Sequence, residues 1–398
     1  MIIELDNAAQ LITQAARCES SQPEDILNLL RSDLDWARVL QLAERNYVIP
    51  LLHEALTNAA PELTPSSVFE QLGMQRKHLR FRARIFCDEL ARLAGLLAEA
   101  DISVLHYKGP ISSDMLYGDV YRRTSFDLDF LVRKSELGAV CRLLQEQNYS
   151  CNVDLPEVQR IQFEREQKEY AFTSGLVCVE PHWSITANRY NLHLDYERLW
   201  DRAVAHDFEG TDLLTFSRPD TLVLMSVVGA KGKWKRLQMV SDIAQLYKQL
   251  DPLDTEEALT LAKELGCERM LLVGSRLASS LLGAPLPEAI LSRCRADARA
   301  VDRIAKQVVE QLFTAQPEAG MLGSSPSIFS PLLYAMRERR RDRLHYLVQT
   351  TTTPLPMHMA RMPLPRWAHP LYRVAVPLHD YLLAPSMRAA RSMRRNSQ

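Results

Sequence analysis

Residues 123–132 have the sequence RTSFDLDFLV, and this stretch decides the fold of the central part of the 398-residue chain. Charged and apolar residues first alternate and then give way to a fully apolar end, a pattern that predicts a β-strand over 126–132. Side chains two apart on a strand point to the same face, so Asp127 and Asp129 can hold a divalent cation between them. The stretch therefore predicts a sheet with an acidic site on it.

The same tripeptide, Asp-Leu-Asp, also occurs at 33–35. There it follows Ser32 and precedes a helical pattern that begins at Trp36, where acidic residues cap and stabilise a helix N-terminus. The tripeptide alone therefore decides nothing, and the weight of Asp127 and Asp129 comes from their surroundings.

Lys108 and Gly109 stand between a β-prone run over 102–107 and a helix that Pro110 begins. Backbone N–H groups at such a turn, together with the helix dipole, can receive the phosphates of a nucleotide. Ser112 and Ser113 fall in the first helical turn. Their hydroxyls are candidates for further phosphate donors, although serine near a helix start is also ordinary capping chemistry.

Glu180 and His182 lie on one face of a predicted strand over 176–185, which follows Gly175 and an expected strand over 169–174. A third carboxylate beside Asp127 and Asp129 would suit two magnesium ions. Such a site can position an acceptor hydroxyl for attack on a nucleotide's α-phosphate and neutralise the departing pyrophosphate. The pattern points to nucleotidyl transfer.

Three segments together resemble the bacterial uncharacterised nucleotidyltransferases of the DNA polymerase beta-like superfamily. They are LHYKG at 105–109, RTSFDLDFLV at 123–132 and VEPHW at 179–183, and the family has roughly L-K-G, R-x-x-x-D-I-D-L-L-V and E-x-H-W. Further likeness covers the helical segments around 35–52 and 231–242. Departures from the family pattern are Phe126 before the first aspartate, Pro110 after the glycine, and Lys-Gly in place of Gly-Ser.

The resemblance implies that Asp127, Asp129 and Glu180 are catalytic metal ligands for Mg²⁺ or Mn²⁺. It implies that a nucleoside triphosphate, with ATP expected, binds at Lys108, Gly109, Ser112, Ser113 and Arg123, and that an unidentified acceptor receives the nucleoside monophosphate. Two alternatives stay open. One is a catalytically silent nucleotide-binding or partner-binding scaffold of the same fold, and the other is a toxin-like enzyme that modifies tRNA or a protein.

Several side chains near these motifs have ordinary structural explanations beside functional ones. Arg123, four residues before Asp127, either contacts phosphate or forms a structural ion pair with the neighbouring aspartates. His182 either supports the carboxylates from a hydrogen-bonded core position or binds metal. Lys231 and Arg236, with Trp234 between them, either line the cleft or form a solvated basic helix face.

We expect an α+β protein in which a small mixed β-sheet nucleotidyltransferase domain is flanked by helical N- and C-terminal regions. Expected boundaries are a helical region over 1–100, the nucleotidyltransferase core over 101–200, a helical domain over 201–330, and a basic, proline-punctuated segment over 331–398.

The composition indicates a globular chain, with 46% hydrophobic and 24% charged residues. No apolar run approaches the roughly 18 residues of a membrane span, and no signal peptide is evident, so no membrane span and a cytoplasmic location are expected. The seven cysteines form no C-x-x-C pair, which argues for reduced thiols over a zinc site. Neither a P-loop nor a Ser-His-Asp pattern is evident.

The C-terminal end is basic, because residues 335–398 contain 12 arginines against Glu338, Asp342 and Asp380, a net charge of +9. Nucleic-acid binding is conceivable there but not favoured, since acidic residues are interleaved among the arginines and aromatic residues are sparse. Over 351–385 we expect an extended segment with short helices, and the last dozen residues are expected to be disordered.

Overall fold

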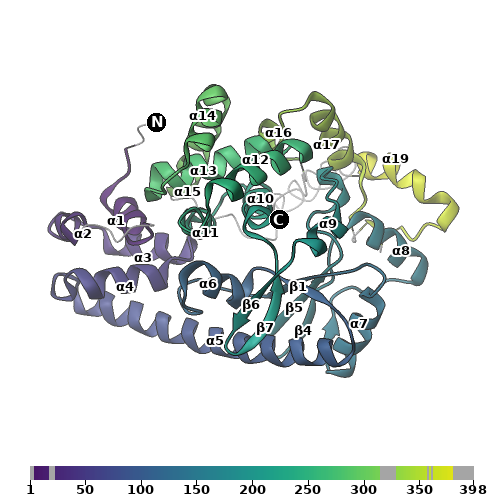
Figure 1. Ribbon diagram of the computed structural model, residues 1–398, viewed down its shortest axis with the longest axis horizontal. Helices are drawn as coiled ribbons and strands as arrows, with labels where there is room; N and C mark the ends of the chain where they lie inside the picture. Colours follow the sequence, from purple (N-terminus) through teal and green to yellow (C-terminus); the bar gives the residue numbers. More distant parts are fainter. Residues whose placement is uncertain (1–3, 18–22, 314–328, 356–357, 360–361, 380–398) are drawn as a thin grey trace, which may run out of the picture.

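The computed structural model describes residues 4–17, 23–313, 329–355, 358–359 and 362–379. It has the expected α+β fold, in which helices surround one mixed seven-stranded sheet (Figure 1). The end of the chain expected to be disordered lies outside the described residues.

The N-terminal region is helical, as expected. Its helices are α1 (Asn7–Ala15), α2 (Pro23–Leu30), α3 (Trp36–Arg45), α4 (Ile49–Ala59), the short 3-10 helix η1 (Pro61–Leu63) and α5 (Ser66–Glu99). The Asp-Leu-Asp at 33–35 serves here as a cap, because the Asp35 side chain accepts a hydrogen bond from Arg38 N–H at the start of α3. Helix α5 runs beneath both the N-terminal helices and the sheet (Figure 1) and so joins the two parts of the molecule.

The sheet has the strand order β3-β4-β5-β2-β1-β7-β6. Its strands are β1 (Val104–His106), β2 (Leu128–Val132), β3 (Ser150–Cys151), β4 (Phe172–Ser174), β5 (Val177–His182), β6 (Val204–Phe208) and β7 (Thr211–Thr215). Strand β2 pairs antiparallel with β1 and parallel with β5. The β6–β7 hairpin extends the sheet past residue 200, where the sequence patterns place its end.

Helices connect the strands and cover the sheet. They are α6 (Gly109–Tyr117), α7 (Leu137–Glu146), α8 (Glu157–Glu166), the 3-10 helix η2 (Asn188–Tyr190) and α9 (Tyr196–Asp201). Because side chains alternate along β2, Leu128, Phe130 and Val132 join the apolar core that α5 and α7 share. Asp129 and Leu131 face the other way, toward α9 and the C-terminal helices.

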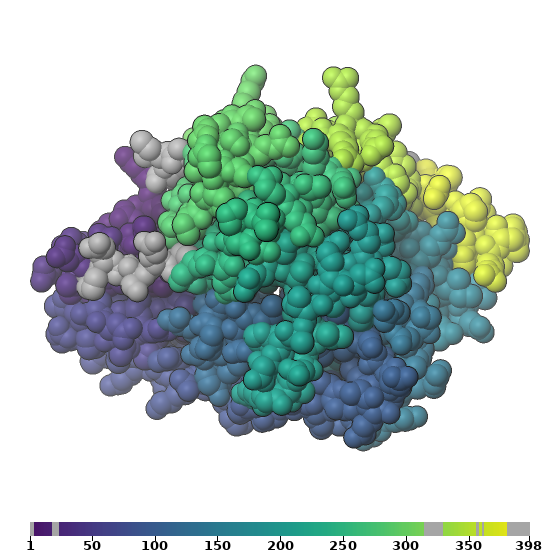
Figure 2. All heavy atoms as spheres, viewed as in Figure 1, coloured from purple at the N-terminus to yellow at the C-terminus, as the bar shows by residue number. Residues whose placement is uncertain are grey.

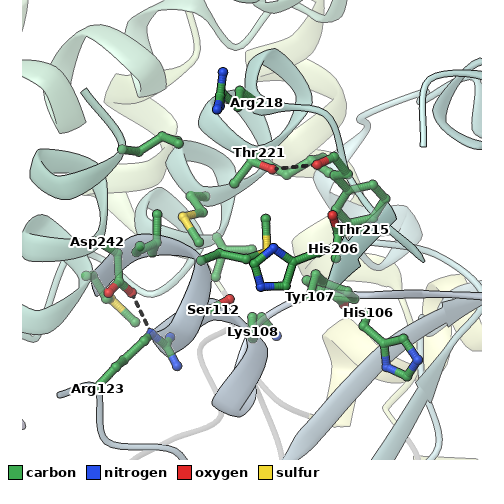
Figure 3. A pocket seen from close by; sticks show the side chains of 18 of the residues that line it. His106, Tyr107, Lys108, Ser112, Arg123, His206, Thr215, Arg218, Thr221 and Asp242 are labelled. Carbon is green, nitrogen blue, oxygen red and sulfur yellow. Dashed lines mark hydrogen bonds and ion pairs between the residues drawn. The ribbon is translucent and has the colours of Figure 1, made fainter. Parts of the chain in front are cut away.

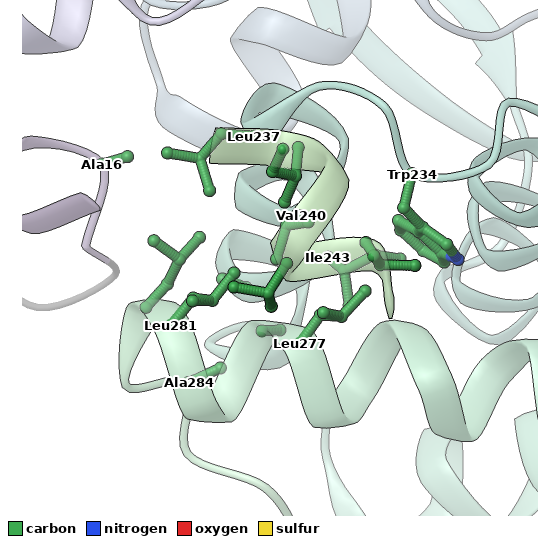
Figure 4. Packing of buried hydrophobic residues seen from close by; sticks show 14 of the residues in the cluster. Ala16, Trp234, Leu237, Val240, Ile243, Leu277, Leu281 and Ala284 are labelled. Carbon is green, nitrogen blue, oxygen red and sulfur yellow. The ribbon is translucent and has the colours of Figure 1, made fainter. Parts of the chain in front are cut away.

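The C-terminal helices form a separate layer above the sheet (Figure 1). They are α10 (Arg218–Lys231), α11 (Leu237–Tyr247), α12 (Pro252–Leu265), α13 (Glu268–Leu282), α14 (Glu288–Ala296) and α15 (Ala298–Phe313). Trp234 is fully buried in this layer beside Ile243 of α11 (Figure 4). Trp234 is therefore a packing residue and does not line a cleft.

The remaining described segments are α16 (Pro331–Met336), α17 (Arg340–Thr352), the 3-10 helix η3 (Arg366–Leu371) and α19 (Tyr372–Pro377). Of these, η3 and α19 lie within 351–385, where short helices in a proline-punctuated segment were expected. None of the described helices is both long and apolar enough to cross a membrane. The cysteines within the described ranges are free thiols.

Candidate active site

The acidic site lies on the sheet face that looks toward the C-terminal helices. Asp129 of β2 and Glu180 of β5 are direct partners in the parallel ladder, so their side chains leave the sheet on the same side. Asp127 immediately precedes β2 and shares this face. Burial, together with the nearby Asp129 carboxylate, raises the pKa of Asp127 to about 7. The structure thus brings together the three carboxylates predicted from the sequence.

Asp129 is buried and strongly bonded through one of its oxygens. Its Oδ1 accepts hydrogen bonds from Lys108 Nζ at 2.7 Å and from His182 Nε2 at 2.8 Å. Burial alone would raise the pKa of Asp129, but the Lys108 ammonium and the His182 hydrogen bond hold it below its usual range. Asp129 is therefore ionised at neutral pH.

His182 is fully buried and fixed from both ring nitrogens. Its Nδ1 lies 3.1 Å from Glu169 Oε2 and 3.4 Å from Lys168 Nζ, and Lys168 also pairs with Glu169. Burial lowers the pKa of His182, which favours the neutral ring. With the ring proton on Nε2, facing Asp129, Nδ1 accepts from Lys168 Nζ, and Glu169 acts by holding Lys168. His182 thereby orients Asp129, while its Nε2 stays within 3.6 Å of Glu180 Oε2.

Lys108 and Gly109 form the turn between β1 and α6, and both have positive φ angles, of 65° each. A side chain at Gly109 would bring a Cβ to 3.2 Å from the backbone oxygen of Asp127, so glycine is needed for both conformation and space. Within the described part of the chain, no side chain caps the start of α6, and Pro110 has no N–H to offer. The other N–H groups of this first turn are available to an anion.

The two serines of the first turn of α6 differ in their surroundings. Ser113 is fully engaged, because its Oγ donates to the Asp119 backbone oxygen at 2.6 Å and accepts from Arg123 N–H at 3.0 Å. Ser112 lines the cavity described below. Ser112 therefore faces a ligand space, whereas Ser113 fastens the loop that leads to β2.

The Arg123 side chain, 12% exposed, forms an ion pair with Asp242 of α11, with Nε 3.0 Å from Oδ2. Tyr117 of α6 donates to the other oxygen of Asp242 at 3.1 Å. On the same loop, Thr124 N–H donates to Gln238 Oε1, and Gln238 Nε2 donates back to the Thr124 backbone oxygen, each at 3.0 Å. Helix α11 therefore holds the segment that carries Asp127. Arg123 forms its structural ion pair with Asp242, whereas the sequence suggested the neighbouring Asp127 as its partner.

Phe126 points away from the carboxylates. Its ring lies 4.8 Å from the Tyr47 ring, the Arg82 guanidinium lies over it at 4.3 Å, and 38% of the residue is exposed. The Arg236 guanidinium stacks on the Tyr47 ring, 4.0 Å from the ring centroid. The large residue before Asp127 therefore leaves the space between the carboxylates open.

Three lysines converge on the acidic site. Burial, followed by the repulsion of Lys231 and Lys108, lowers the pKa of Lys168 to about 6. Burial and Lys108 likewise lower the pKa of Lys231 to about 8. Their charges repel one another in a poorly solvated place, and a polyanion bound among them would relieve that repulsion.

A cavity of about 1070 Å³ opens beside this site. It lies between α6, the β6–β7 hairpin, α10 and α11, where the molecular surface is hollowed (Figure 2). Lys108, Ser112 and Arg123 line it (Figure 3). Asp127 and Arg236 also belong to its lining. Its wall away from the carboxylates is largely apolar and is formed by Met115, Leu116, Leu224, Met225, Val228, Met239 and Leu246.

The donor set suits a divalent cation. Asp129, Glu180 and His182 each offer a ligand atom, and these atoms lie within 4.8 Å of one another. Asp129 Oδ2 is buried with no hydrogen-bond partner among the described residues, which is costly unless a cation or water satisfies it. Carboxylate oxygens are the ligands that Mg²⁺ and Mn²⁺ prefer.

Sequence reasoning did not identify Lys168 and Glu169, which fix His182. Their signal was weak: a charged pair directly before a short strand. Glu169 reaches the site because it forms an isolated antiparallel bridge with His182. His206 of β6 was also missed, and it lines the cavity with Nε2 2.8 Å from Asp114 Oδ2.

Comparison with known proteins places these features in a family. The family described as uncharacterised nucleotidyltransferase matches residues 32–283, more than half of the chain. Among solved structures, the chain is similar to an antigenic nucleotidyltransferase-like protein from Paracoccidioides brasiliensis, with 17% identity and a TM-score of 0.31 over 52% of this chain and 95% of that one. No curated protein matches. By its match over 32–283, the chain belongs to the family of uncharacterised nucleotidyltransferases.

Proposed function

We propose that this protein transfers a nucleoside monophosphate from a nucleoside triphosphate, ATP in the first instance, to an acceptor and releases pyrophosphate. The observation that carries the proposal is the register that sets Asp129 opposite Glu180, with Asp127 on the same face and the uncapped start of α6 beside them. Membership of the family supports nucleotidyl transfer as the class of reaction.

In this proposal Asp127, Asp129 and Glu180 hold Mg²⁺ or Mn²⁺, and His182 orients Asp129. The metal would supply charge neutralisation at the α-phosphate and at the leaving group. Asp129 Oδ2, which has no hydrogen-bond partner among the described residues, supports Asp129 as a ligand. The ligand atoms that lie within 4.8 Å of one another belong to Asp129, Glu180 and His182, so this cluster supports Glu180, while Asp127 is assigned from its place two residues before Asp129.

The proposed reaction needs three tasks from the chain's own residues. The first turn of α6, with Gly109 and Ser112, binds the phosphates through N–H and hydroxyl donors. Glu180, whose side chain is 22% exposed, accepts the proton of the acceptor hydroxyl as its oxygen attacks the α-phosphorus. Lys108, with Lys168 and Lys231 nearby, stabilises the pyrophosphate that leaves as the bond between the α- and β-phosphates breaks.

Other residues have supporting roles in the proposal. Arg123 and Ser113 hold the loop before Asp127 through Asp242 and Asp119, and Arg236 lines the cavity that takes the rest of the substrates. The polymerase beta-like superfamily is proposed as the wider relationship because the carboxylate pair and the glycine turn recur in the order its motifs have. The bacterial branch of that superfamily is proposed on the same motifs.

We also propose that the chain has four parts and works in the cytoplasm. The parts are the helical region 1–100, a catalytic core that begins at 101, a helical region that follows it, and the basic segment from 331. Extending the core to Thr215 includes the whole sheet. Free thiols at the described cysteines are compatible with a reducing compartment.

The test is transfer of label from α-³²P-labelled nucleoside triphosphates, together with pyrophosphate release, with and without Mg²⁺. Asp129→Asn should abolish both signals. Asp33→Asn is the matched control, because it changes the same kind of residue in the other Asp-Leu-Asp and should leave both unchanged. Nucleotide binding without transfer would favour the silent scaffold, and label on tRNA or protein would favour the toxin-like alternative.

A further inference from the structure

The C-terminal segment carries an unusual surface. We define the basic apolar face as the exposed residues within the described parts of 340–379. Its members are Arg340, Arg341, Leu344, Leu347, Val348, Pro363, Pro365, Arg366, Trp367, Pro370, Leu371, Arg373, Val374 and Leu378. Every one of them is arginine, proline or a large apolar residue. Trp367 is 81% exposed, Leu344 63% and Val374 60%.

The helices that build this face have buried residues on one side and exposed apolar residues on the other. On α17, Leu344, Leu347 and Val348 follow helical spacing on the outer side, while Tyr346 and Thr350 are buried. Across η3 and α19, Trp367, Leu371 and Val374 project outward, while Tyr372 and Val376 join the core beneath the sheet. The buried side of each helix already packs against the protein core. The outer apolar residues therefore do not contribute to the packing of the fold.

The charge of the face has one sign because Glu338 and Asp342, the acidic residues in the described part of this segment, turn inward. Glu338 accepts hydrogen bonds from the backbone N–H groups of Glu268 and Arg269 at 3.1 Å each, at the start of α13. Asp342 is 4% exposed. The outward charge on the described part of this segment is thus carried by arginine alone.

We infer that the basic apolar face binds the surface of an anionic lipid bilayer. Exposed leucine, valine and tryptophan beside arginines fit the boundary between acyl chains and anionic headgroups, where each part of the surface finds a favourable environment. Nucleic acid would use the arginines but leave the aliphatic side chains in water, so it fits less well. This inference does not depend on the proposed reaction.

The experiment is co-sedimentation of the full chain with vesicles of phosphatidylcholine alone and of equal parts phosphatidylcholine and phosphatidylglycerol. We expect binding to the anionic vesicles only, weakened by salt. Replacing two apolar anchors, Trp367→Ser with Val374→Ser, should weaken binding about tenfold or more. Reversing charge with Arg366→Glu and Arg373→Glu should weaken it to a similar degree. Thermal melting of each variant establishes that it is folded.

Two controls match these changes elsewhere on the surface. Leu253→Ser removes a residue that is 79% exposed on α12, and Arg299→Glu reverses an exposed charge on α15, and neither should alter binding. Brominated lipids should quench the fluorescence of Trp367, and Trp367→Phe should bind normally but lose that quenching.

Several results would overturn the inference. They are no binding to anionic vesicles, equal binding to neutral ones, or binding unaffected by the variants of the face. The inference also fails if these variants instead abolish self-association or RNA binding while the vesicles remain unbound.

Discussion

Asp129 and Glu180 face each other across the parallel pairing of β2 and β5, although 50 residues separate them in the chain. The register of two parallel strands fixes which residues lie opposite each other. Neither carboxylate can therefore move out of the site without disturbing the middle of the sheet. His182 lies two residues beyond Glu180 on the same strand and hydrogen-bonds Asp129 from the side. The site is therefore built on rigid elements.

Metal binding should depend on these residues unequally. We expect Asp129→Asn to weaken Mn²⁺ binding about 100-fold or more, because the buried ligand oxygen loses its charge. His182→Gln, which removes an orienting partner, should weaken binding about 10- to 100-fold. Paramagnetic resonance titration of free Mn²⁺ measures both effects, with Asp33→Asn as the unchanged control. Equal binding by Asp129→Asn and the unmodified protein would remove the carboxylates from consideration as ligands.

The stability of the metal-free protein should rise as pH falls toward 5, as far as Asp127 is concerned. The pKa of this carboxyl is about 7 in the fold against 3.8 as the ordinary value, so the folded state binds a proton that the unfolded state has already lost. Above pH 7 the free-energy cost of burying the ionised Asp127 is fully present. Between pH 7 and 3.8 this cost falls by up to about 1.4 kcal/mol per pH unit.

Asp127→Asn removes this titration. In EDTA, it should raise the melting temperature at pH 8 more than at pH 5, while it abolishes transfer. Melting curves at the two pH values provide the measurement. An equal shift of the melting temperature at both pH values would mean that the fold does not raise the pKa of Asp127.

The turn at Gly109 should tolerate no side chain. Gly109→Ala combines a positive φ with a Cβ 3.2 Å from the Asp127 backbone oxygen, and Gly118→Ala has nearly the same φ with open space around it. Both should lose about 1–2 kcal/mol of unfolding free energy from backbone strain. Only Gly109→Ala should also lose nucleotide binding, measured by calorimetry at a temperature where both variants are folded. If Gly118→Ala lost binding equally, the turn would have no special role.

Trp234 should be sensitive to a single methyl group on either side. A Cβ at Gly229 would lie 2.5 Å from the Trp234 ring, and one at Gly274 would lie 2.6 Å from it. We expect Gly229→Ala to lower the unfolding free energy by about 1–3 kcal/mol in denaturant titration. Gly95→Ala on α5, with no atom near its added Cβ, should instead raise it by about 0.5–1 kcal/mol. If Gly95→Ala also lowered the unfolding free energy, the loss in Gly229→Ala would be a general effect of alanine in these helices and not a clash with Trp234.

Much of this arrangement is predictable from sequence because it depends on local patterns. The alternation before Val132 predicts β2, and the strand period places Asp127 with Asp129 and Glu180 with His182. The β6–β7 hairpin escaped prediction because its strands are half exposed and Gly210 stands alone as a turn signal. The strand period alone cannot reveal which strands become neighbours. The resemblance suggested that Glu180 lies near Asp129, and the order and register of the strands in the sheet make the two residues direct partners.

Contacts made over long sequence distances explain the rest. Lys168 and Glu169 reach His182 only because β4 and β5 form a hairpin that folds back on the site. Arg123 meets Asp242 through the packing of α11, more than 100 residues away. No spacing rule connects such residues, which is why the role of Arg123 stayed open at the level of sequence.

The two hydrogen bonds between Thr124 and Gln238 bear on how this protein can be dissected. A fragment that ended at the last strand would expose both backbone groups of Thr124 to solvent and leave the loop before Asp127 without its anchor. Such a truncated piece would keep its carboxylates but lose their fixed spacing. Complementation by the missing helices, added as a second polypeptide, would be needed to restore that spacing.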